Sequence, residues 1–100
     1  MRVYKKVRLK DWEIDVIKKV IKSFDKNAKI YIYGSRANLN KKGGDIDILV
    51  ISKNISLEIQ LKIKAKLIKF LGDRKIDLLI AKNKKETNFI ELIYNQAVEI

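Results

Sequence analysis

Hydrophobic residues recur every three or four positions in three stretches of this chain, and they form nearly continuous runs in three shorter stretches. The helical spacing is clearest at 11–25, where lysines occupy the face opposite the apolar one. Asp11 is a suitable N-cap for this helix because its carboxylate can accept backbone hydrogen bonds. The apolar face consists of Ile14, Ile17, Val20, Ile21 and Phe24.

The stretch 57–71 fits two patterns. Its apolar residues alternate with polar ones as in a strand, but it is long for a strand and consists of good helix formers. We therefore predict a helix, with Ser56 as its N-cap and Gly72 at its C-terminal end. One stripe of this helix holds Leu57, Leu61, Ala65 and Ile68, and the other holds Ile59, Ile63, Leu67 and Phe70. Only one stripe can face a sheet; the second stripe, which begins at Ile59, is the candidate surface for a partner or for self-association.

The three apolar runs, at 28–33, 45–51 and 75–81, are rich in β-branched residues and predict strands. Residues 48–51 are apolar on both faces, which is typical of a central strand covered on both sides. Thr87 is a suitable cap for a last amphipathic helix. The apolar face of that helix is Phe89, Ile90, Ile93, Tyr94 and Ala97.

This order of elements predicts an α/β fold, a two-layer sandwich with a small mixed β-sheet. One hundred residues are enough for one core, so a single domain should span 1–100. The segment Met1–Lys10 fits either an edge strand or a basic arm. No apolar run is long enough to cross a membrane and no signal-peptide pattern opens the chain, so we expect a soluble, cytoplasmic protein that does not contact membranes.

Charge and missing residue types limit the chemistry. The net charge of +11 favours anionic partners, although lysines spread along the whole chain also fit a compositional bias or the surface of a heat-adapted protein. There is no cysteine, hence no disulfide or thiolate metal site. There is no histidine either, which excludes the usual zinc sites, Ser-His triads and imidazole bases. Catalysis would have to use carboxylates, hydroxyls, lysines and a hard metal ion.

One stretch combines such groups. The first predicted strand ends in Gly34-Ser35, and after nine intervening residues Asp45 and Asp47 open the second. Two positions apart on a strand, these carboxylates would share a face with Cα atoms about 6.5 Å apart, close enough to bind the same magnesium ion. Backbone N–H groups and the hydroxyl of Ser35 could hold phosphate oxygens, and Gly34 would leave room for close approach. This arrangement is typical of phosphoryl and nucleotidyl transfer.

With these motifs in place, Gly34–Ala37 and Gly44–Val50 resemble the signature of the minimal nucleotidyltransferases, small members of the DNA polymerase β-like superfamily. The resemblance covers nearly the whole chain. It implies the polymerase β-like nucleotidyltransferase fold, Mg²⁺ as cofactor and ATP as substrate. The loop between the motifs is one residue shorter than is common in the family, so the resemblance does not assign roles to residues 38–43.

The resemblance also implies roles for single residues. Gly34, Ser35 and Arg36 would bind nucleotide phosphate, and Asp45 and Asp47 would bind magnesium. A third acid would also bind the metal and would help to deprotonate the acceptor. Two acids compete for that third place. Asp77, in the third predicted strand, is the natural match, and Asp73 in the turn before it is the rival.

Plainer interpretations of the same residues stay open. Asp77 could be a strand-end acid paired with Lys75 or Arg74, and Arg36 could be an ordinary surface residue. Lys41 and Lys42 fit a solvated loop better than a triphosphate site, although both roles are open. Tyr31 and Tyr33 are interpreted as core and sheet-face residues, and Trp12 as a packing residue.

Nothing follows the third predicted strand except one short helix, so an acceptor would have to be presented by another chain. In this family the usual partner is a helical HEPN toxin encoded nearby. The resemblance thus implies an antitoxin that transfers AMP from ATP to a tyrosine of that toxin. Two alternatives stay open, namely a non-catalytic antitoxin that neutralises its partner by contact, and transfer to a small molecule such as an aminoglycoside at a homo-oligomer interface. A nucleic acid is the least favoured direct substrate, because no aromatic residues are interleaved on a basic surface.

Overall fold

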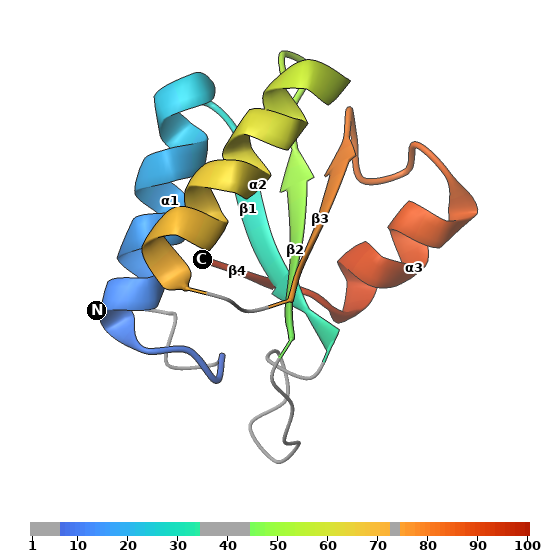
Figure 1. Cartoon of the computed structure of the whole chain (residues 1–100). Helices are drawn as coiled ribbons and strands as arrows, with labels where there is room; N and C mark the ends of the chain where they lie inside the picture. Colours follow the sequence, from blue (N-terminus) through green and yellow to red (C-terminus); the bar gives the residue numbers. More distant parts are fainter. Residues whose placement is uncertain (1–6, 35–44, 73–74) are drawn as a thin grey trace.

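The structure is a computed structural model that describes residues 7–34, 45–72 and 75–100 (Figure 1). Helices and strands follow in the predicted order, with one additional short strand at the end. The elements are α1 (Asp11–Phe24), β1 (Lys29–Tyr33), β2 (Ile46–Ile51), α2 (Leu57–Leu71), β3 (Ile76–Ala81), α3 (Asn88–Gln96) and β4 (Val98–Glu99). The predicted α/β fold with a small mixed sheet is confirmed. The predicted two layers become three, because α3 covers the second face of the sheet.

The sheet has four strands in the order β3-β2-β1-β4. β1 is antiparallel to both β2 and β4, whereas β2 and β3 are parallel. Parallel neighbours require a crossover connection, and α2 provides it. The additional strand β4 holds the end of the chain on β1, where the N–H of Ile100 donates to the carbonyl of Ile30 at 3.0 Å.

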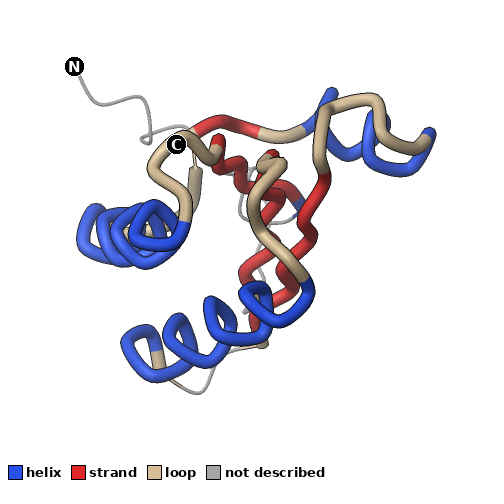
Figure 2. Tube along the Cα trace, turned by 90° about the horizontal axis from the view of Figure 1, so that it is seen from above, coloured by secondary structure: helices blue, strands red, loops and turns tan. Residues whose placement is uncertain are grey.

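Helices cover both faces of the sheet. α1 and α2 lie over one face, and α3 lies over the other (Figure 2). The first face is an aliphatic core because alternate residues of each strand point toward the two helices. Its fully buried residues include Ile14, Ile17, Ile21, Ile30, Ile32, Ile46, Ile48, Ile63 and Leu67. The second face carries a smaller cluster made of Tyr31, Leu49, Ala81, Ile90 and Ile93.

The start of α1 differs from the prediction. Lys10, not Asp11, occupies the N-cap position, and its backbone N–H donates to the Glu13 carboxylate at 2.8 Å. This contact holds Glu13 inside the protein, with 2% of its surface exposed. Asp11 is instead the first helical residue and lies on the exposed side. Trp12 is 48% exposed, so its interpretation as a packing residue is wrong; the second position of α1 points away from the sheet.

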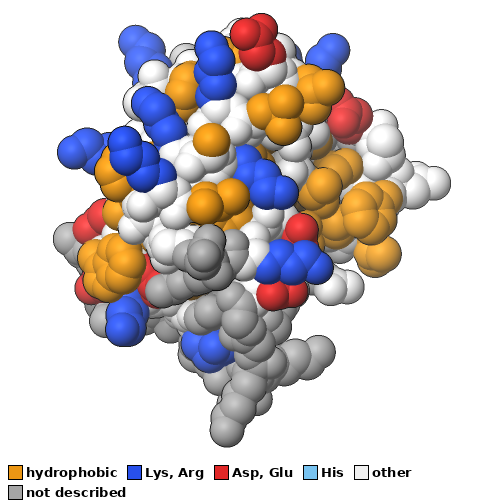
Figure 3. All heavy atoms as spheres, viewed as in Figure 1, with side chains coloured by type: hydrophobic (Ala, Val, Ile, Leu, Met, Phe, Trp, Pro, Cys, Tyr) orange, Lys and Arg blue, Asp and Glu red, His pale blue; other side chains and the backbone are white. Residues whose placement is uncertain are grey.

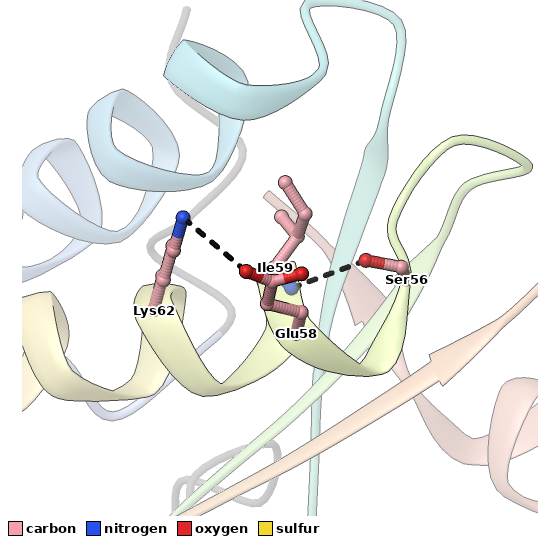
Figure 4. A network of polar contacts seen from close by, with 4 residues as sticks. All are labelled: Ser56, Glu58, Ile59 and Lys62. Atoms are coloured by element: carbon pink, nitrogen blue, oxygen red, sulfur yellow. Dashed lines mark hydrogen bonds and ion pairs between the residues drawn. The ribbon is translucent and has the colours of Figure 1, made fainter.

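Both predicted caps of α2 are confirmed. The hydroxyl of Ser56 accepts a hydrogen bond from the N–H of Ile59 at 3.2 Å (Figure 4). One turn further on, exposed Glu58 and Lys62 form an ion pair of 3.8 Å. At the other end Gly72 has φ +88°, a conformation that costs glycine little because it lacks a Cβ.

The two stripes of α2 are exchanged relative to the prediction. Ile63 and Leu67 are fully buried, so the stripe assigned to a partner surface is the core stripe, and that assignment is wrong. Leu57 and Leu61 are 72% and 62% exposed instead. The side-chain amide of Gln60 donates to the carbonyl of Leu78 at 2.8 Å, which ties one side of α2 to β3 and fixes the rotation of the helix about its axis.

The last helix begins at its predicted cap, where the Thr87 hydroxyl accepts from the N–H of Ile90 at 3.1 Å. Ile90 and Ile93 are buried as expected, but Phe89 is 60% exposed because it lies outside the part of α3 that contacts the sheet. Within residues 7–34, 45–72 and 75–100, no helix has the length and apolar character needed to cross a membrane.

Candidate active site

A row of three polar side chains crosses the sheet at the start of β2. Tyr33 on β1 pairs in register with Asp47 on β2, and Asp47 pairs in register with Asp77 on β3. Because side chains alternate along a strand, all three point to the face that carries α3, opposite the aliphatic core. Adjacent strands lie about 4.8 Å apart, so the two carboxylates are direct neighbours. We call Tyr33, Asp47 and Asp77 the carboxylate row.

The carboxylate row lies at the N-terminal end of β2, which is the lower end of this strand in Figure 1. Asp45 immediately precedes β2 and is exposed, whereas Asp47 and Asp77 are partly buried. Asp47 is thus held by ladder hydrogen bonds on both sides, since β2 is a central strand. A rigid central strand fixes the position of its carboxylate more firmly than a loop would.

Gly34 lies directly against the carboxylate of Asp47. A Cβ atom at position 34 would overlap Oδ2 of Asp47 and come within 3.3 Å of its Cγ. Gly34 also has φ +70°, a conformation that residues with a side chain rarely adopt. The sequence predicted that this glycine leaves room for a ligand; the structure shows that it leaves room for a candidate metal-binding carboxylate.

The environment of Asp47 disfavours its negative charge. The pKa of Asp47 is raised from 3.8 to about 6, mainly by burial, and four further contributions act on it. The hydrogen bond with Asp77, the charge of Asp77 and the charge of Asp45 all raise the pKa, while Lys75 lowers it. Two carboxyl groups that crowd each other in this way favour a shared proton or a bound cation.

Tyr33 stays protonated beside these acids. Burial and then the negative charges of Asp47 and Asp77 raise the pKa of the Tyr33 phenol to about 12. A neutral phenol can donate a hydrogen bond but cannot act as a base near neutral pH. Sequence reasoning treated Tyr33 as a sheet-face residue and missed its place in the row, because only the register of β1 against β2 reveals it.

The structure describes only some of the predicted site residues. Ser35 and Arg36, predicted to bind phosphate, lie outside the described residues, as do Lys41, Lys42 and Asp73. For the third acid, the geometry places Asp77 beside Asp47. Lys75, considered as a partner of Asp77, acts on Asp47 by lowering its pKa. Of the predicted set, the structure therefore brings together Gly34, Asp47 and Asp77, with Asp45 close enough for its charge to act.

The carboxylates of Asp45, Asp47 and Asp77 are suitable ligands for a hard divalent cation. Carboxylate oxygens are the ligands that Mg²⁺ prefers, and a cation between Asp47 and Asp77 would remove the repulsion that raises the pKa of Asp47. In the part of the chain that the structure describes, no three acidic side chains converge into a ready-made metal-binding cluster. Asp45 would have to turn toward the pair to complete one.

The fold and the carboxylate row together define a nucleotidyltransferase-type domain: a mixed sheet in which acids on two parallel strands meet at one end. Residues 15–100 match the family model described as "Polymerase beta, Nucleotidyltransferase", and the chain therefore belongs to this family. The match includes all three strands that carry the row and begins within α1. No curated protein matches the chain. The predicted superfamily is thus confirmed, and with it nucleotidyl transfer as the general activity.

Proposed function

We propose that this protein is a magnesium-dependent nucleotidyltransferase that transfers AMP from ATP to a hydroxyl group of a partner protein. The observation that carries the proposal is the in-register pair of Asp47 and Asp77, with Asp45 two positions away, in a chain of this family. Acids that crowd one another cost stability in a ligand-free protein. A cation-binding role accounts for that cost.

Each residue has a separate role in this proposal. Asp45, Asp47 and Asp77 would hold Mg²⁺, which would neutralise the triphosphate and make the α-phosphorus more electrophilic. Asp77 orients the acceptor hydroxyl and takes its proton. The acceptor oxygen forms a bond to the α-phosphorus, the bond from that phosphorus to the bridging oxygen breaks, and pyrophosphate leaves. Tyr33, a neutral phenol beside Asp47, fixes the orientation of that carboxylate.

The partner in this proposal is a HEPN-type helical toxin encoded nearby, with a tyrosine as acceptor and the present chain as antitoxin. Resemblance to the minimal nucleotidyltransferases supports this choice. The exposed stripe of α2, defined by Leu57, Leu61 and Ile68, supports a protein contact as well. These residues are 72%, 62% and 37% exposed and lie beside lysines 62, 64 and 69, so an apolar surface rimmed by acidic residues would fit.

Transfer can be tested directly. The protein is incubated with the product of the neighbouring gene, magnesium and ATP labelled at the α-phosphate, and label is sought on the partner. We expect labelling that is lost in the double variant Asp45→Asn, Asp47→Asn and retained in Glu58→Gln, an exposed acid on α2. Absence of label with the wild-type protein, or label that survives the double substitution, would refute the catalytic proposal.

Neutralisation by contact alone is a second candidate, favoured by the exposed stripe of α2. In that case complex formation and toxin inhibition should survive substitution of both aspartates. Substituting Leu61 with aspartate should instead abolish the complex, because it places a charge in the centre of the stripe. The two substitution sets therefore separate transfer from contact.

A further inference from the structure

Three lysines meet at the end of the sheet opposite the carboxylate row. β1 begins where β2 and β3 end, because it is antiparallel to β2, which is parallel to β3. Lys29 at the start of β1 pairs with Ile51, and Ile51 in turn pairs with Ala81. Lys53 and Lys82 follow shortly after β2 and β3. The topology thus gathers cations from three separate parts of the sequence at one edge, at the upper end of β2 in Figure 1.

These lysines line a cavity of about 240 Å³. The other lining residues come from the end of α1 and the turn after it, and from the end of β2 and the turn that follows. The lining residues are Asp25, Asn27, Lys29, Ile51, Ser52, Lys53, Asn54 and Lys82. We call this cavity the lysine pocket.

A buried hydrogen-bond network forms the floor of the lysine pocket. Asp25 is 8% exposed, and its carboxylate accepts from the Ser52 hydroxyl at 2.5 Å and from the Asn27 N–H at 3.0 Å. The hydrogen bond from Ser52, then that from Asn27, holds the pKa of Asp25 below its usual value. The Ser52 oxygen also accepts from the N–H of Asn54 at 3.1 Å. The Asp25 carboxylate is therefore occupied by hydrogen bonds from Ser52 and Asn27.

The charge balance of the lysine pocket is positive. Among the described residues, the lining contains three lysines and one carboxylate, and that carboxylate is already hydrogen-bonded. The next acid along the chain, Glu86, accepts from the backbone N–H of Lys82 at 3.1 Å and is not part of the wall. Lysines are also spread over the surface of α1 and α2, where they alternate with hydrophobic side chains (Figure 3). Two of them, Lys19 and Lys66, line a cavity between these helices, but the rest of that lining, as far as the structure describes it, contains no amide or carboxylate side chain. A small anion with several hydrogen-bond acceptors fits the lysine pocket best.

The lysine pocket is separate from the carboxylate row. Asp47 and Ile51 are four residues apart along β2, which corresponds to about 13 Å of strand, and Lys53 lies beyond the end of that strand. Asp45 and Asp47 would repel an anion, so the two ends of the sheet have opposite preferences. The lysine pocket is not needed for the proposed chemistry, and its test is independent of that chemistry.

We propose that the lysine pocket is a phosphate-binding site. Its ligand is a phosphate group, carried either by a free phosphate compound or by the backbone of a single-stranded nucleic acid. Phosphate oxygens accept hydrogen bonds from ammonium groups, and the wall offers three of these with no unsatisfied acid beside them. Binding strengthens as salt falls, because exposed lysines contribute mainly through screened charge.

The test is an NMR titration of the full chain in EDTA at low salt. The probes are pyrophosphate, AMP and a single-stranded hexanucleotide. We expect saturable shifts in the amide signals of Asn27, Ser52 and Asn54, with the signal of Asp47 unmoved. If the hexanucleotide binds more tightly than both AMP and pyrophosphate, the phosphate comes from a nucleic-acid backbone. If pyrophosphate binds as tightly as the hexanucleotide or more tightly, the ligand is a free phosphate compound.

The variant Lys29→Gln, Lys53→Gln, Lys82→Gln should weaken binding about tenfold, the sum expected for three exposed charge contacts. Its matched control is Lys62→Gln, Lys64→Gln, Lys69→Gln on α2, which removes the same charge from exposed positions outside the pocket. The control should keep nearly the wild-type affinity. Equal weakening in both variants, shifts confined to the carboxylate row, or no saturable binding of any probe would overturn the proposal. Thermal unfolding of both variants verifies that they are folded.

Discussion

Replacing Asp47 by asparagine should stabilise the ligand-free protein at neutral pH. Burial and the neighbouring Asp77 raise the pKa of Asp47 to about 6 from 3.8, so the fold disfavours the ionised side chain. Asparagine keeps the size of the side chain and its ability to form hydrogen bonds, but it removes the charge. The fold should therefore gain the free energy that the ionised carboxylate costs.

The sign and size of this effect follow from linkage. A carboxyl group with a raised pKa in the folded state stabilises the fold while it is protonated, so stability falls as pH rises from about 4 to about 6 and is constant above that range. A shift of about two units corresponds to at most about 3 kcal/mol. Asp47 is partly exposed, and solvent screening reduces the expected gain to about 1 kcal/mol. For a domain of this size, that gain raises Tm by roughly 4–8 °C.

Urea denaturation in EDTA at pH 7.5 and pH 4 measures the gain. Asp47→Asn should be more stable than the wild type at pH 7.5 and equal to it at pH 4, where the native carboxyl is protonated. Glu58→Gln, an exposed control on α2, should show no such pH dependence. Magnesium should stabilise the wild type and leave Asp47→Asn unchanged. An asparagine variant that is no more stable at pH 7.5, or a gain that persists at pH 4, would refute the reasoning.

Four further substitutions test other parts of the structure. Gly34→Ala should lower the free energy of unfolding by about 1–2 kcal/mol, because alanine disfavours the positive φ at this position. It should also lower nucleotidyl transfer, because the new Cβ displaces the Asp47 carboxylate. A variant with full stability and activity would contradict both expectations. Ile63→Ala should lower the free energy of unfolding by about 2–5 kcal/mol because Ile63 is buried, whereas Leu61→Ala should change it by no more than about 0.5 kcal/mol because Leu61 is exposed. Equal losses in urea denaturation would contradict the assignment of the two stripes of α2. Ser52→Ala should cost about 1.5–3 kcal/mol at pH 7, because a hydrogen bond to a charged group is lost. The pKa of Asp25 is lowered in the fold, so this difference should shrink as pH falls below about 4; a pH-independent difference in unfolding would contradict it.

Local signals in the sequence predicted the elements well. The bounds of α2 match the predicted range because Ser56 and Gly72 are strong caps at its two ends. At α1 the helix was predicted but its N-cap was not. The N-cap is Lys10, whose backbone N–H donates to the Glu13 carboxylate, and no rule based on N-cap side chains selects a lysine. The strand β4 is only two residues long, too short to show an alternating pattern.

Arrangement in space was harder to predict. Both stripes of α2 are apolar, so their composition does not reveal which one faces the sheet; the contact of Gln60 with β3 and the packing of α1 decide it. Alternation placed Asp45 and Asp47 on one face, but it does not give the register between strands. The pairing of Asp47 with both Asp77 and Tyr33 is a property of the folded sheet, and it turns three separate motifs into one site.

The cost of the carboxylate row also distinguishes the two proposed functions. A module that acts only through the exposed stripe of α2 gains nothing from crowding Asp47 against Asp77 on the opposite side of the sheet, and it would become more stable if that charge were removed. A transferase needs both charges to hold a cation and accepts the lower stability. An Asp47→Asn variant that is more stable, still binds the partner and no longer transfers a nucleotide would establish that the row is present for chemistry. A variant that is more stable and neutralises the partner as well as the wild type would establish that contact is sufficient.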